Sequence, residues 1–272
     1  MMMAMHPLQP IFSICSLQTP EVVKPRRRFQ NSFFATFFAA SALLLQSAWT
    51  SCLAQPAPPV SQGEFLNAWH FNDTNFLSFF GDPPKAAQGL SLVPSWEGNA
   101  VKIAATNSLL QYREIGTNGT TTNIVCQNGT VFLWFLPNWN SGTGPGSYGR
   151  LIEMGSYTTN ASYGWWSFYL DPFGTNLFFS GQTNGAGATY LNASINLTTN
   201  HWTFLALTYS SSNSFLFTNG TLCATGTGVA YFPGSGVRGS NGFCIGGSLG
   251  SQNLSLGRFE WMRTYNYPES AA

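Results

Sequence analysis

The sequence predicts an all-β fold, a two-sheet antiparallel β-sandwich that forms a single domain. The first observation is composition: of 272 residues, 44% are hydrophobic and only 8% are charged, which is enough apolar material for a large core. The second is that no long stretch repeats apolar residues at helical spacing. The third is that short apolar runs recur between clusters of Gly, Asn, Pro and Ser, as in proteins built from many strands and turns.

Seven apolar runs are the clearest predicted strands: Thr130–Leu136, Leu151–Met154, Trp165–Asp171, Leu177–Ser180, Trp202–Tyr209, Ser214–Thr218 and Arg258–Tyr265. Two turns are predicted between these strands. Pro172–Asn176 predicts a hairpin between two of the runs, and Asn219-Gly220 is a dipeptide typical of tight turns. Strands of this length with no helix between them predict a sandwich or a barrel.

The N-terminal region, residues 1–54, has the pattern of an export signal. Arg26–Arg28 precede an apolar run at Phe33–Leu45, which is too short to span a bilayer comfortably, and the small residues of Cys52–Ala54 follow. We predict cleavage after Ala54, a Pro-rich linker over 55–63, a domain over 64–270 and a secreted or cell-surface location. An uncleaved anchor and a start codon later than the first Met are the alternatives.

The charge balance excludes one class of partner. Without Glu21, Lys24 and Arg26–Arg28, seven basic and nine acidic residues remain, a net charge of −2. Such a chain has no basic field for nucleic acid. Its surface polarity must come from Ser, Thr, Asn, Gln and Gly, which suit sugars better than phosphates, and no transmembrane span is predicted in the mature chain.

An ordered series of segments resembles the laminin-G-like jelly rolls of the concanavalin A-like lectin/glucanase superfamily. The segments are Gly129–Pro137, Arg150–Gly155, His201–Ser210, Phe215–Gly220, Phe243–Gly247 and Gly257–Asn266. The resemblance covers about residues 64–270. It implies a jelly roll whose opening strand, Trp69–Asp73, pairs near the closing one. Trp261 stands where the family usually has a second acid in the closing strand, so the resemblance does not extend to a salt-bridging or ion-binding role for that pair.

Three cysteines remain after the predicted cleavage. Cys223 and Cys244 each follow an Asn-Gly turn, and we predict a disulfide between them, because exported proteins sustain disulfides. Cys126 is then expected to be reduced and buried. Three free thiols are the alternative.

The strand Trp165–Asp171 is the candidate carbohydrate-binding element. Alternation sends Trp166, Phe168 and Leu170 to one face, which we assign to the core. The other face then carries Trp165, Tyr169 and Asp171, two amphipathic rings and a carboxylate, a mixture that stacks on sugars and hydrogen-bonds to their hydroxyls. Replacing Trp165 should therefore be milder for folding than replacing Trp166. The alternative is that Trp165 and Tyr169 merely line the sheet beneath a covering loop.

Calcium is the ion that the resemblance implies, held by side-chain oxygens together with backbone carbonyls. Asp73 and Asp82 are the candidate ligands, because both lie in Asn-, Gly- and Pro-rich surroundings. The alternative is that both are turn-forming residues, which is the usual role of an acid at a turn.

Catalytic chemistry has little support in the pattern of acids. Glycosidases of this fold carry a Glu-x-Asp-x-x-Glu run, whereas no two of the nine mature acids here lie within four residues of each other. The sequence therefore predicts a secreted, non-catalytic binding or adhesion module for carbohydrate or an extracellular protein. The alternatives are a polysaccharide-degrading enzyme whose acids, such as Glu153 and Asp171, converge in space, and a structural fragment of a larger surface adhesin.

Overall fold

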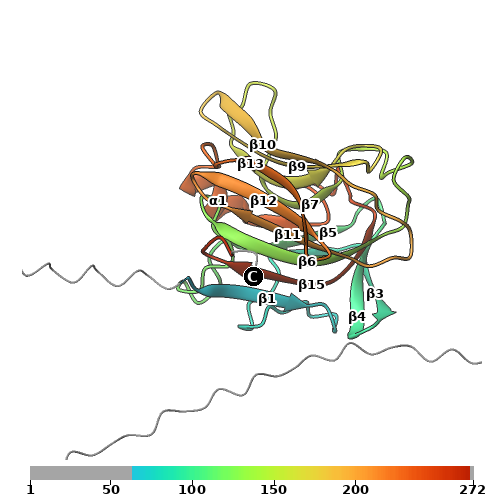
Figure 1. Ribbon diagram of the computed structural model, residues 1–272. Helices are drawn as coiled ribbons and strands as arrows, with labels where there is room; N and C mark the ends of the chain where they lie inside the picture. The colour runs from blue at the N-terminus through green and yellow to red at the C-terminus, as the bar shows by residue number, and fades with distance from the viewer. Residues whose placement is uncertain (1–62, 270–272) are drawn as a thin grey trace, which may run out of the picture. The chain divides into compact units, whose positions relative to one another are not determined.

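The computed structural model describes residues 63–269, so the predicted signal at 1–54, the start codon and nearly all of the linker lie outside the described part. Within it, two antiparallel sheets stack as a sandwich, and the all-β prediction is confirmed (Figure 1). One short helix, which the sequence did not predict, accompanies them.

The first sheet has eight strands in the order β13-β12-β11-β6-β15-β4-β3, with β1 paired to β15. Residues far apart in the sequence are neighbours here, as in β11 against β6 and β15 against β6. The strands are β1 Phe65–His70, β3 Leu90–Ser95, β4 Gly98–Ile103, β6 Gly129–Pro137, β11 Thr203–Tyr209, β12 Asn213–Thr218, β13 Thr221–Thr227 and β15 Gly257–Tyr265.

The second sheet has seven strands in the order β10-β9-β8-β7-β14-β5-β2. It carries the candidate binding strand, β8, near its middle. The strands are β2 Ala86–Gln88, β5 Leu109–Tyr112, β7 Arg150–Gly155, β8 Trp165–Leu170, β9 Asn176–Thr183, β10 Ala186–Ser194 and β14 Phe243–Ile245.

The hydrophobic core is formed by alternate residues of strands from both sheets. Trp166, Phe168 and Leu170 of β8 are buried in it, together with Leu133 and Phe135 of β6. The prediction that alternation in β8 sends these three residues inward is therefore confirmed. Strand parity also fixes which residues of β8 face away from the core.

All seven predicted strands form, whereas several further strands escaped the sequence analysis. The edge strands β10 and β13 have several exposed residues, and Thr, Gly and Asn interrupt their apolar residues, so neither contains the apolar run by which strands were recognised. The helix α1, Ser235–Asn241, has no buried residue and no apolar repeat. It is tied to the sheet by an ion pair between Arg238 and Glu114 and by a hydrogen bond from Lys85 Nζ to the Ser240 carbonyl.

The opening and closing strands pair, as the resemblance implied. In β1 and β15, Phe65 is opposite Tyr265 and His70 is opposite Trp261. Strand β15 also pairs with β6 along its length and with β4 near its start, so it lies inside the sheet rather than at its edge (Figure 1).

Both predicted turns form. Asn219 and Gly220 have φ values of 50° and 81°, both in the left-handed region, as a tight two-residue hairpin turn requires. The hairpin over Pro172–Asn176 joins β8 to β9.

The predicted disulfide between Cys223 and Cys244 is wrong. Both thiols are free, and they belong to different sheets: Cys223 is exposed on β13, and Cys244 is buried on β14. The prediction failed because an Asn-Gly turn before a cysteine does not determine which sheet the following strand joins. Cys126 is buried and free, as predicted.

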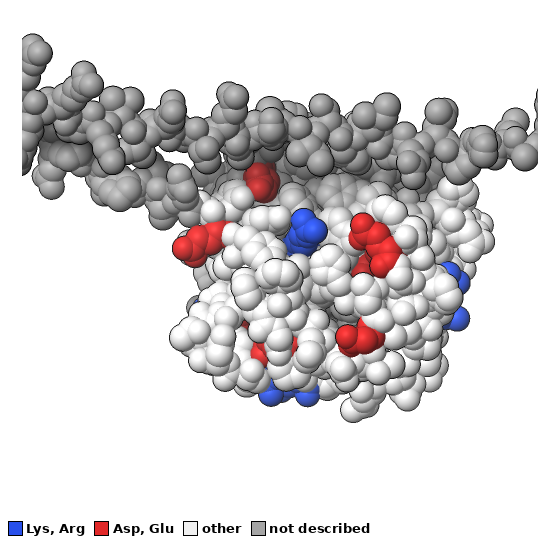
Figure 2. Space-filling view, turned by 90° about the horizontal axis from the view of Figure 1, so that it is seen from below, with Lys and Arg blue, Asp and Glu red and all other residues white. Residues whose placement is uncertain are grey.

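The surface carries few charges. On the face shown in Figure 2, charged side chains stand apart among uncharged ones. In the described range 63–269, no helix is long and apolar enough to cross a membrane.

Candidate functional site

The segment from about residue 231 through α1 contacts the seven-stranded sheet near the ends of β5, β7 and β8. Pro233 lies beside Gly155 and Gly164, and Gln111 Nε2 donates a hydrogen bond of 2.5 Å to the Asn241 carbonyl. A pocket lies over β8, β9 and β10, on the face of this sheet that points away from the core.

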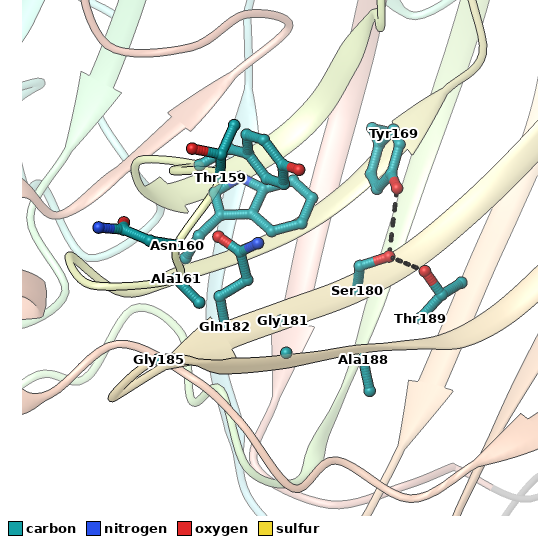
Figure 3. A pocket seen from close by; sticks show the side chains of 13 residues that line it. Thr159, Asn160, Ala161, Tyr169, Ser180, Gly181, Gln182, Gly185, Ala188 and Thr189 are labelled. Carbon is teal, nitrogen blue, oxygen red and sulfur yellow. Dashed lines mark hydrogen bonds between the residues drawn. The ribbon is translucent and has the colours of Figure 1, made fainter.

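This open pocket has a volume of about 410 Å³. Three aromatic rings contribute to its wall, those of Tyr157, Trp165 and Tyr169. Uncharged polar side chains form much of the rest (Figure 3): Thr159, Asn160, Ser180, Gln182 and Thr189. Aromatic faces beside hydroxyls and amides are a surface that suits a polyhydroxylated ligand.

A chain of hydroxyls crosses the floor of this pocket from strand to strand. Tyr169 Oη lies 3.2 Å from Ser180 Oγ, which lies 3.0 Å from Thr189 Oγ1 (Figure 3). Strand β9 pairs with both β8 and β10, and Ser180 lies opposite Thr189, so the outward side chains of the three strands meet. The chain holds the Tyr169 ring in place and presents hydroxyl groups to the pocket.

A second pocket, of about 240 Å³, adjoins the first and shares the same three rings. Tyr148 and Arg150 complete its lining. Tyr148 and Tyr157 are 51% and 52% exposed, so these two rings are accessible to a ligand. Together the two pockets form one aromatic-lined depression, which we call the β8 groove.

Arg150 is buried in the wall of this groove, only 6% exposed. Its guanidinium carbon lies 5.0 Å from the centre of the Trp165 ring and 4.6 Å from that of Tyr169, both cation–π distances. Its Nε lies 2.7 Å from Glu153 Oε2, which also accepts a 2.7 Å hydrogen bond from Trp165 Nε1. The Arg150 contact is an ion pair rather than an aligned hydrogen bond, since Nε finds no acceptor of good geometry.

A β-bulge in β7 brings Arg150 to this face. Ile152 is opposite Phe168 but Arg150 is opposite Tyr169, so Leu151 is an extra residue in the ladder. Without it, Arg150 would point the same way as Ile152, into the core. Bulges commonly re-aim side chains in this manner. The sequence held one signal of this bulge. Strict alternation would place Arg150 and Glu153 on opposite faces of one buried strand, and one of the two charges would then point into the core.

The structure brings together two of the three predicted sugar-binding residues. Trp165 and Tyr169 both line the β8 groove, and Trp165 is only 3% exposed. That its replacement is milder for folding than that of Trp166 stays a prediction. Asp171 lies in the hairpin after β8: its carboxylate accepts hydrogen bonds from Thr175 N and Oγ1 and from Asn176 N, and it lines neither pocket. Sequence reasoning missed Tyr148 and Tyr157, which lie in loops.

The two candidate calcium ligands are held by protein donors. Asp82 Oδ1 accepts hydrogen bonds from Thr117 N and Oγ1, and Asp82 Oδ2 accepts one from Asn123 Nδ2. Asp73 caps a turn by accepting from Asn75 N. Within residues 63–269, no three His, Cys, Asp or Glu side chains cluster as metal ligands would. In this structure both carboxylates stabilise turns, and their role as calcium ligands stays a prediction.

The buried acids predict that stability peaks under mildly acidic conditions. Burial raises the pKa of Glu114, Glu153 and Glu260 above 4.5, although Arg238 and Arg150 oppose the shift in the first two. A raised folded-state pKa means that the native state binds the proton more tightly, so stability falls as pH rises above 4.5. For Asp171, burial acts to raise the pKa, but hydrogen bonds from Asn176 and Thr175 outweigh it and the net shift is downward from 3.8.

We therefore expect stability to decline below pH 3.8, as Asp171 is protonated, and to decline again above pH 4.5. Urea denaturation across pH 3 to 8 measures this, and Glu153→Gln should flatten the upper decline. A free energy of unfolding that rises steadily from pH 4.5 to pH 7 would contradict the prediction.

Comparison with known families identifies the fold independently. The family model described as the concanavalin A-like lectin/glucanases superfamily matches residues 112–272, more than half of the chain. The chain belongs to this superfamily. The matched range begins in β5 and includes every strand that lines the β8 groove, and the jelly-roll resemblance is thereby confirmed.

Solved structures share the superfamily fold at low sequence identity. Domain 4 of AbnA, a GH43 extracellular arabinanase from Geobacillus stearothermophilus in complex with arabinotriose, is 14% identical with a TM-score of 0.58, over 77% of this chain and 95% of that one. The binding domain of Paraclostridial Mosquitocidal Protein 1 is 13% identical with a TM-score of 0.55, and the match covers 76% of this chain and 50% of that one. Trypanosoma rangeli sialidase in complex with sialic acid is 12% identical with a TM-score of 0.52, and the match covers 76% of this chain and 31% of that one. Comparison with the curated proteins finds no match.

Proposed function

We propose that this protein is a secreted carbohydrate-binding module whose site is the β8 groove. The observation that carries the proposal is the joining of two pockets through three shared aromatic rings, beside a floor of hydroxyl and amide groups. Sugars combine apolar C–H faces with many hydroxyls, so they need both kinds of surface at once. The predicted export signal supports an extracellular setting. The arabinotriose complex of AbnA domain 4 supports sugar binding as a use of this fold.

A non-catalytic role is part of the proposal. Glu153 is buried and already engaged by Arg150 and Trp165, and Asp171 is engaged by its hairpin. A general acid or base must lie within hydrogen-bonding distance of the scissile bond, and these two carboxylates are engaged elsewhere. Release of reducing ends from a panel of polysaccharides, abolished by Glu153→Gln or Asp171→Asn, would instead identify an enzyme.

Replacing Tyr157 should weaken sugar binding without harming the fold. The ring is half exposed and lines both pockets, so Tyr157→Ala is expected to lower affinity by on the order of 1 kcal/mol or more, about fivefold. The melting temperature should change little, because exposed side chains contribute little to stability. A glycan array on the full chain finds the ligand, and titration calorimetry measures the affinity.

Phe173 offers a matched control for this variant. It is an exposed aromatic residue in the β8–β9 hairpin and lines neither pocket of the groove. Phe173→Ala should bind like the wild type. An equal loss of affinity in both variants would contradict the assignment of the site to the β8 groove. Binding to an extracellular protein, with no binding to any glycan, would contradict sugar recognition.

A further inference from the structure

Arg150 sets one end of the β8 groove apart from the other. The larger pocket is lined by uncharged residues only, whereas the smaller pocket contains this one guanidinium. Neither lining includes an Asp or Glu among the described residues. The groove therefore has no charged side chain in its lining at the β9–β10 end, whereas its other end presents the guanidinium of the Arg150–Glu153 pair.

The guanidinium keeps unused hydrogen-bonding capacity. Its Nε side faces Glu153, but Nη1 is buried and has no acceptor among the described residues. A buried donor of a charged group without a partner is costly, and folded proteins rarely leave one unless something else supplies the acceptor. Trp165 and Tyr169 lie at cation–π distance from the group, and Arg150 lines the smaller pocket, so the part of the guanidinium that reaches this pocket is what it can offer to a ligand.

The chemistry of that edge selects the acceptor. A guanidinium presents its N–H groups in a planar fork that matches a carboxylate, and such charge-assisted bonds are about twice as strong as neutral ones. A sugar hydroxyl offers one oxygen and no charge, so it uses this fork less well.

We propose that the Arg150 end of the β8 groove binds the carboxylate of an acidic sugar, while the uncharged end holds the neighbouring residues of the same saccharide. This rests on the proposed function, because it assigns a ligand class to that site. The carboxylate can belong to a hexuronate or to a sialic acid, and both present the same planar anion to the guanidinium.

Matched ligand pairs test the inference on the full-length wild-type chain. One pair is an oligogalacturonate and its carboxyl-reduced form, and the other is sialyllactose and lactose. Titration calorimetry should show at least tenfold tighter binding for the acidic member of one pair, and this preference should shrink between 50 and 500 mM NaCl. Preference in the first pair identifies a hexuronate site, and preference in the second identifies a sialic acid site.

The double variant Arg150→Gln/Glu153→Gln removes both charges together and so leaves no buried charge unpaired. It should lose the acidic preference, whereas Arg263→Gln, on β15 of the other sheet, should retain it. Equal affinity for both members of each pair overturns the inference but leaves carbohydrate binding intact. A preference that survives in a folded double variant also overturns it, and absence of binding to every sugar overturns the proposed function as well.

Discussion

Trp166→Ala is expected to cost on the order of 3–5 kcal/mol of folding stability, which is enough to unfold a marginal domain. The indole is fully buried between the sheets, with ring centres 5.2 Å from Phe179 and 5.5 Å from Tyr209. Its Nε1 donates a 3.1 Å hydrogen bond to the Cys126 carbonyl, so truncation opens a cavity and leaves that carbonyl without this donor. Urea denaturation measures the change.

Trp96 provides the control for this prediction, because it is the same residue type at 56% exposure. Trp96→Ala should alter stability by less than about 1 kcal/mol. Trp165→Ala should fall between the two, since its ring is buried but lies at the groove rather than in the core, and its loss removes the hydrogen bond that Trp165 Nε1 donates to Glu153 Oε2. Equal costs for Trp166 and Trp96 would show that the core is misassigned.

The second large effect concerns the ion pair beneath the β8 groove. Arg150→Gln leaves the Glu153 carboxylate buried without its cation and is expected to cost about 3–5 kcal/mol at neutral pH. The loss of stability arises mainly because the Glu153 charge stays buried without a partner, and less from the net contribution of the ion pair itself. Its magnitude should fall at lower pH, where the raised pKa of Glu153 allows the carboxyl to be protonated.

A double-mutant cycle separates these contributions. Adding Glu153→Gln to Arg150→Gln should recover much of the lost stability, because neither charge then remains alone. Thermal and urea denaturation of the two single variants and the double variant at pH 7 and pH 5 complete the cycle. Strictly additive costs at pH 7 would mean that the two side chains do not interact in solution.

The fold was predictable because seven of its strands carry apolar runs long enough to be recognised in the sequence. Strands β10 and β13 were missed because their apolar residues are interrupted by Thr, Gly and Asn, although Tyr190 and Leu191 of β10 are buried in the core. Helix α1 was missed because its side chains contribute nothing to the core and its position depends on contacts with Glu114 and Lys85.

The candidate site was only half predictable, because alternation is a local rule. It placed Trp165 and Tyr169 on the correct face, but it could not show how deeply neighbouring loops bury Trp165. It assigned Asp171 to the same face, although the strand ends at Leu170 and the carboxylate serves the hairpin. Arg150 reaches the groove through a bulge, which breaks the rule on which the reasoning depended.

The position of β15 has a consequence for how the chain assembles during synthesis. Among the described strands, β15 is the last to emerge from the ribosome, yet β6 pairs with one of its edges, and β4 and β1 pair with the other. Until residues 257–265 are available, β1 lacks its partner and β6 presents an open edge beside apolar side chains. The eight-stranded sheet therefore closes late, through contacts nearly two hundred residues apart in the sequence. A topology so dominated by non-local pairing folds slowly, and the unfinished chain is most prone to aggregation in that interval.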